Sequence, residues 1–155
     1  MRSTFVVACL LMLFTLSGCF KKNEPCTPVS PQAEETAILN YAATNGIVAT
    51  KHNSGLYYQI VSEGSGATPN INSTVGITYV GKLTNNVEFD GKSTPVEWPL
   101  NNLIAGWQIG LPLIKEGGEI ILLVPSEYAY GCYSPAPTIP ANSILVFNVK
   151  LISVK

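Results

Sequence analysis

The second half of this chain consists of short segments with the composition of β-strands, separated by turns rich in glycine, proline and asparagine. The expected strands are residues 56–61, 74–84, 87–91, 96–98, 119–124 and 144–154. Among them, only residues 103–111 (LIAGWQIGL) have the spacing of a short helix. Several strands with one short helix after the fourth predict a single α+β domain. We expect its sheet to curl around that helix and to bury Trp107 between them.

A second helical segment precedes the strands. Ile38, Leu39 and Ala42 are spaced for one helical face within residues 33–46, and Asn45-Gly46 is a stop signal. One short helix is too small to be a dimerisation domain, so it either packs against the strands or only spaces them from what precedes. Residues 20–32 (FKKNEPCTPVSPQ) carry three prolines without apolar periodicity, which is typical of a flexible tether.

The first residues indicate the compartment. A short basic start is followed at residues 5–16 by an almost wholly apolar run. Roughly a dozen residues are too few for a membrane-spanning helix, which needs about 20, so we expect a secretory signal. Residues 16–19 (LSGC) resemble a bacterial lipobox, in which Cys19 is lipidated and becomes the new N-terminus. We therefore expect a lipid-anchored protein of the bacterial cell envelope, facing the periplasm or the surface; the alternative is an ordinary secreted protein with a chance cysteine.

The net charge and the cysteines argue against nucleic-acid-binding and zinc-binding proteins. Arg2 is the only arginine, so removal of the leader leaves 8 lysines against 10 acidic residues and a formal charge of −2, which argues against nucleic-acid binding. Cys26 and Cys132 then remain, and in an oxidising compartment they either pair or stay as free thiols. Only His52 could join them on a metal, so we expect no zinc site, and no cofactor is expected.

Aromatic residues within the strand segments accompany a single acid. Asp90 is the only aspartate of the chain, and the aromatic residues are Tyr79, Phe89, Trp107, Tyr130 and Phe147. No serine, cysteine or histidine stands in catalytic company, so an enzyme built on this set would use a shaped apolar pocket instead of a nucleophile. Taken alone, Tyr79, Trp107 and Phe147 are better explained as plain core packing, and Asp90 could simply cap the turn into Gly91.

The order of short motifs is more specific than any single residue. The motifs are residues 77–81 (ITYVG), 89–90 (FD), 103–107 (LIAGW), 115–118 (KEGG), 128–131 (YAYG) and 139–143 (IPANS), followed by 145–147 (LVF). In this order and spacing, residues 55–155 resemble the FKBP-type peptidyl-prolyl isomerases. The resemblance implies an antiparallel half-barrel of five or six strands wrapped around one short helix, with a hydrophobic pocket between helix and sheet.

The resemblance also implies roles for individual residues. Those implied to be catalytic are Asp90, Tyr130, Trp107 and Phe147. Those implied to bind substrate are Tyr79, Phe89, Leu103, Ile104, Ile139, Val96 and Trp98. Trp107 forms the pocket floor, while the Ile104 N–H and the Tyr130 hydroxyl donate to substrate carbonyls. Val96 stands where family members often carry an aromatic, and Trp98 lies on the same side. No arginine remains to pair with Asp90, which then acts through its field or by holding Tyr79.

These expectations define the domains and two functional hypotheses. The domains are a signal peptide (1–18), a tether (19–32), a short helix with its linker (33–54) and an isomerase domain (55–155). The first hypothesis is a prolyl isomerase that assists the folding of envelope proteins, and the second is a non-catalytic binding or chaperone module. A structural lipoprotein is a third. Expected partners are proline-containing polypeptides, macrolide immunosuppressant-type ligands and the membrane, with the protein acting as a monomer.

Overall fold

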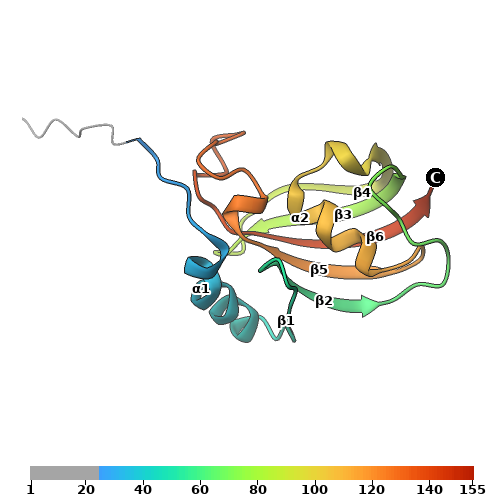
Figure 1. Ribbon diagram of the computed structural model, residues 1–155, viewed down its shortest axis with the longest axis horizontal. Helices are drawn as coiled ribbons and strands as arrows, with labels where there is room; N and C mark the ends of the chain where they lie inside the picture. Colours follow the sequence, from blue (N-terminus) through green and yellow to red (C-terminus); the bar gives the residue numbers. More distant parts are fainter. Residues whose placement is uncertain (1–24) are drawn as a thin grey trace, which may run out of the picture.

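The computed structural model describes residues 25–155, so the expected signal peptide and Cys19 lie outside the described residues. Within these described residues, the chain forms one six-stranded sheet, two α-helices and three short 3₁₀ helices (Figure 1). The strands are β1 (Thr50–Lys51), β2 (Tyr57–Ser62), β3 (Thr74–Leu83), β4 (Glu88–Pro99), β5 (Glu119–Val124) and β6 (Leu145–Val154). The helices are α1 (Pro31–Thr44), α2 (Ala105–Gly110), η1 (Leu100–Asn102), η2 (Leu111–Leu113) and η3 (Ser126–Tyr128). In the part described, no helix is long and apolar enough to cross a membrane.

All neighbouring strands are antiparallel, in the order β1-β2-β5-β6-β3-β4. The α+β half-barrel expected from the sequence is thus confirmed, with six strands. Strand side chains alternate between the two faces of a sheet, and α2 covers the face that carries most of the core. Val75, Ile77 and Tyr79 alternate toward this inner face and are buried there with Trp107 of α2.

The outer face of the sheet holds a second, smaller core. Helix α1 begins with Pro31 and buries Ile38, Tyr41 and Ala42 against Leu123 and its neighbours on the sheet. Figure 1 shows α1 beside the strand ends, away from α2. Of the two alternatives for this helix, packing against the sheet is therefore the one observed.

Strand β4 differs from the expected arrangement. Residues 87–91 and 96–98 were expected to be separate strands joined by a loop, which is wrong: β4 runs without a break from Glu88 to Pro99. A register shift against β3, between the pairs Ile77–Val96 and Tyr79–Lys92, accommodates the intervening residues. β4 is an edge strand, and an edge tolerates a proline such as Pro95, which cannot donate a backbone hydrogen bond. The turn-forming residues between 91 and 95 therefore produce an irregularity in the strand pairing and not a loop.

Candidate active site

A cavity of about 430 Å³ opens between the inner face of the sheet and α2. Its lining residues are Tyr79, Phe89, Asp90, Trp98, Pro99, Asn102, Leu103, Ile104, Trp107, Tyr130 and Phe147. The sequence placed nine of these in a substrate pocket. They come from β3, β4, β6, the start of α2 and the loop after η3, so only the tertiary structure brings them together.

Aromatic edges and faces form the floor of this cavity. The ring centroids of Trp107 and Phe147 are 5.1 Å apart and nearly perpendicular, as are those of Tyr79 and Trp107. Phe89 meets Phe147 in the same way at 5.7 Å. Edge-to-face contacts suit the charge distribution of aromatic rings. The Trp107 indole N–H is buried and has no hydrogen-bond partner within residues 25–155.

Glycine at position 81 permits this arrangement. A Cβ at Gly81 would lie 2.8 Å from Phe147 Cε1 and from Phe89 Cζ, which is closer than carbon atoms approach without a clash. The two rings can therefore rest directly against the backbone of β3. The pairing of β3 with β4 also shifts in register between Gly81 and Lys82.

Asp90 is the acid of the cavity. Its Oδ2 accepts a hydrogen bond of 2.5 Å from the Tyr79 hydroxyl, and its Oδ1 accepts one of 2.8 Å from the Gly91 N–H. Two of the alternatives raised by the sequence, holding Tyr79 and capping the backbone at Gly91, are thus present together. None of the three ion pairs found within residues 25–155 includes Asp90.

Burial and the Asp90 carboxylate keep both tyrosines of the cavity protonated. The pKa of Tyr79 is raised well above its ordinary value, first by burial and then by the hydrogen bond to Asp90. The pKa of Tyr130 is raised by burial and by the negative charge of Asp90. At neutral pH both hydroxyls therefore remain hydrogen-bond donors.

This arrangement predicts how stability depends on alkaline pH. Because the pKa of Tyr79 is higher in the folded than in the unfolded state, its stabilising contribution is complete below about pH 10 and is lost as the pH rises through the folded pKa. We expect the free energy of unfolding to fall above about pH 10, and to fall less in Tyr79→Phe. Urea unfolding between pH 8 and pH 11 measures this. Tyr133→Phe, at a side chain 69% exposed, is the control, and equal falls in both variants contradict the prediction.

Two predicted binding residues lie elsewhere. Val96 packs against the core from β4, and Ile139 is buried in the same core, but neither lines the cavity. Both belong to segments whose course depends on the tertiary structure, β4 at its register shift and the loop before β6. Pro99 and Asn102 were missed. Their positions in the sequence could have identified them, because Pro99 follows the candidate Trp98 and Asn102 precedes the candidate Leu103.

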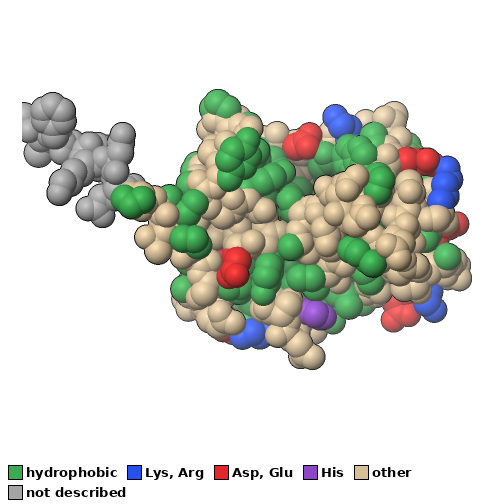
Figure 2. All heavy atoms as spheres, turned by 45° about the horizontal axis from the view of Figure 1, so that its top comes forward, with side chains coloured by type: hydrophobic (Ala, Val, Ile, Leu, Met, Phe, Trp, Pro, Cys, Tyr) green, Lys and Arg blue, Asp and Glu red, His purple; other side chains and the backbone are tan. Residues whose placement is uncertain are grey.

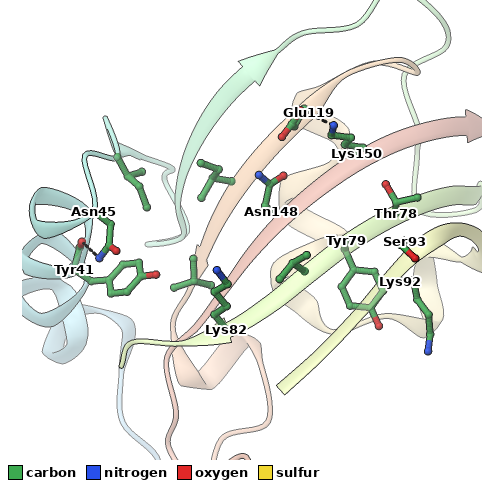
Figure 3. A pocket seen from close by; sticks show the side chains of 14 residues that line it. Tyr41, Asn45, Thr78, Tyr79, Lys82, Lys92, Ser93, Glu119, Asn148 and Lys150 are labelled. Atoms are coloured by element: carbon green, nitrogen blue, oxygen red, sulfur yellow. Dashed lines mark hydrogen bonds and ion pairs between the residues drawn. The ribbon is translucent and has the colours of Figure 1, made fainter. Parts of the chain in front are cut away.

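A second hollow, of about 540 Å³, lies on the outer face of the sheet near the end of α1 (Figure 3). Lys82, Asn148 and Lys150 project from its strands, while Tyr79 and Lys92 point away (Figure 3). It is larger than the inner cavity, but it lacks the paired tyrosine and aspartate and the perpendicular rings. The inner cavity is therefore the candidate active site. On the face shown in Figure 2, hydrophobic side chains gather over the middle of the domain and charged side chains lie mostly toward its periphery.

The cavity residues lie in a segment of the chain that matches a known sequence family. The family described as FKBP-type peptidyl-prolyl cis-trans isomerase matches residues 66–152, which is more than half of the chain. The chain belongs to this family. The FKBP-type segment therefore contains every residue that lines the cavity.

Individual relatives agree with this assignment. The FKBP-type isomerase FkpA of Escherichia coli (strain K12) is 45% identical over 104 residues, which cover 65% of this chain and 38% of the relative. FkpA of Aeromonas hydrophila is 38% identical over 80% of this chain and 46% of its own length. The chain thus spans less than half the length of these two curated relatives.

Solved structures show the same fold. The crystal structure of Escherichia coli FkpA matches with a TM-score of 0.70 at 37% identity, over 81% of this chain and 61% of that one. A peptidyl-prolyl cis-trans isomerase of Pseudomonas syringae pv. tomato matches with a TM-score of 0.69 at 27% identity, over 83% of this chain and 98% of that one.

Proposed function

We propose that this protein catalyses cis-trans isomerisation of Xaa-Pro bonds and assists the folding of cell-envelope proteins. The observation that carries the proposal is the cavity in which Trp107 and Phe147 form an apolar floor beside the Tyr79–Asp90 pair and Tyr130. Its substrates are proline-containing polypeptides. The proposal also includes macrolide immunosuppressant-type compounds as ligands of the same pocket, and action as a monomer.

The proposed mechanism needs no nucleophile. Rotation about the Xaa-Pro bond faces a barrier of ~18–20 kcal/mol that comes from amide resonance, and no covalent bond breaks. The prolyl ring enters the apolar floor, which removes water from the amide. The Ile104 N–H and the Tyr130 hydroxyl donate to carbonyls of the twisted chain. Each ~1.4 kcal/mol by which the site binds the twisted amide better than the planar one gives about tenfold in rate.

Exchange spectroscopy on an Xaa-Pro peptide tests the activity. We expect the full-length protein to accelerate cis-to-trans exchange, and Tyr130→Phe to lower kcat/KM by about tenfold, which corresponds to one lost hydrogen bond of ~1.4 kcal/mol. Tyr133→Phe, in the same loop but 69% exposed, is the matched control with unchanged activity. Exchange no faster than the uncatalysed rate would favour the alternative of a non-catalytic binding or chaperone module.

We also propose that the protein is a lipoprotein held at the bacterial envelope through Cys19, after removal of residues 1–18 as a signal peptide. The support is the sequence pattern of a short apolar run followed by LSGC. Because buried acyl chains contribute about 0.8 kcal/mol per methylene, multiple chains give stable anchoring. We expect the protein to enter the detergent phase on Triton X-114 partitioning and Cys19→Ser to remain in the aqueous phase. Partitioning of the unaltered protein into the aqueous phase would contradict lipid anchoring through Cys19.

A further inference from the structure

The loop between β5 and β6, residues 125–144, forms one rim of the cavity and carries Tyr130. Beyond η3 it has no helix or strand, and much of it, including Tyr133, is exposed. Apart from the buried Ile139, the loop has few buried contacts of its own with which to hold one conformation. The placement of the Tyr130 hydroxyl therefore depends on what ties the loop down.

Backbone hydrogen bonds close the base of the loop beside Tyr130. The Gly131 N–H donates to the Ser126 carbonyl at 2.8 Å, and the Asn142 N–H donates to the Gly131 carbonyl at 2.6 Å. Asn142 has a φ of 54°, a left-handed conformation that asparagine tolerates better than most residues. Ser126 and Asn142 thus both hold the backbone next to Tyr130, whose own carbonyl accepts a hydrogen bond of 2.9 Å from the Tyr133 N–H within the loop.

The N-terminal residues 26–34 in turn hold three residues of this loop, which are Ser126, Cys132 and Asn142. Cys26 forms a disulfide with Cys132, with Cα atoms 5.6 Å apart. The Asn142 side-chain amide donates to the Thr27 carbonyl at 2.9 Å. These ties cross more than 100 residues of sequence.

A carboxylate of α1 makes the third tie. Glu34 is 7% exposed, and its Oε2 accepts a hydrogen bond of 2.7 Å from the Ser126 N–H at the start of η3. Burying a carboxylate is costly unless it is hydrogen-bonded, so this contact is specific. Glu34 lies on the helix that packs against the outer face, and it therefore connects α1 to the base of the rim loop.

We propose that residues 26–34 form an N-terminal clasp that positions Tyr130 for isomerisation, with Cys26 and Glu34 as positioning residues. The proposal rests on the proposed function. All three ties come from outside residues 66–152, the segment that matches the family. If the loop samples other conformations when unclasped, only the fraction with Tyr130 in place binds productively, and kcat/KM falls by that fraction.

Kinetics on the full-length protein test the clasp. We expect Cys26→Ser and Glu34→Ala each to lower kcat/KM by about fivefold, as when one molecule in five is competent. Glu34→Gln keeps an acceptor oxygen and is expected to restore most of the activity. Tyr133→Phe, in the same loop, is the control without effect. If Cys26→Ser proves poorly folded, Glu34→Ala tests the proposal with the disulfide intact.

A double-mutant cycle separates positioning from general destabilisation. In a Tyr130→Phe background there is no hydroxyl left to position, so we expect Cys26→Ser and Glu34→Ala to have no further effect on kcat/KM. An undiminished fivefold loss in that background overturns the proposal, since the clasp then acts other than through Tyr130.

A second readout does not depend on activity. We expect hydrogen exchange of the Gly131 and Asn142 amides to become at least tenfold faster in both variants, because their hydrogen bonds close the base of the loop. Intact-mass measurement of the unreduced protein first verifies that Cys26 and Cys132 carry no alkylatable thiol. If the unaltered protein is not an isomerase, the proposed function fails while exchange still reports on the clasp. Unchanged exchange in both variants overturns the clasp itself.

Discussion

Replacement of Phe147 by alanine is expected to lower the free energy of unfolding by about 3–5 kcal/mol, the range for large-to-small changes at buried aromatic residues. The Phe147 side chain is 4% exposed, and its ring meets the rings of Trp107 and Phe89 edge-on. Its removal leaves a void between β6 and α2 that rigid neighbours fill only in part. Urea unfolding measures the loss.

The same substitution is expected to lower kcat/KM by more than tenfold, because the prolyl ring then rests on a collapsed or hydrated floor and more than ~1.4 kcal/mol of transition-state binding is lost. Trp107→Leu removes the floor from the helix side and is expected to act in the same direction. Phe147→Leu is the matched control for volume, with a smaller loss of stability. If Phe147→Ala and Trp107→Leu both fold and both leave turnover untouched, the site is assigned wrongly.

Replacement of Gly106 by alanine is expected to destabilise the protein by about 1–3 kcal/mol through overpacking. A Cβ at this position would lie 2.4 Å from Val124 Cγ1 and 2.9 Å from Val124 Cγ2. Val124 is fully buried on β5 and β-branched, so it cannot turn away, and α2 must move outward. Trp107, the next residue, moves with the helix.

We therefore expect Gly106→Ala to lower isomerase activity as well as the midpoint of thermal unfolding. Ala105→Ser, at an exposed position of the same helix, is the control and should leave both unchanged. Calorimetry and the exchange assay check the two effects. A Gly106→Ala protein as stable and as active as the original would show that α2 does not need its close approach to β5.

Most strands could be predicted from local pattern. The alternation of Val75, Ile77 and Tyr79 is enough to orient β3, because only one face of that strand is fully buried. The continuous apolar run of residues 120–124 likewise marks β5, a strand covered on both faces. The spacing of residues 103–111 located α2, although the helix is shorter than expected and continues as the 3₁₀ turn η2.

The pattern failed where backbone pairing overrides local signals. Pro95 and the preceding residues indicate a turn in isolation, but pairing with β3 carries β4 through them with a shift in register. Ile139 was expected to bind substrate because of its motif, yet it is buried in the core and is not among the residues that line the cavity. In both cases the deciding energy comes from partners distant in sequence.

The sequence by itself determined the compartment hypothesis and the α+β fold, because burial and backbone preference are recorded locally in each segment. The pocket side chains were predicted from the order of the short motifs, through their resemblance to the FKBP-type family. Only the tertiary structure decided which distant groups meet. Asp90 accepts from both Tyr79 and Gly91, Cys26 joins Cys132, and Glu34 reaches Ser126. No local pattern carries such choices, since each depends on how the whole chain closes around its core.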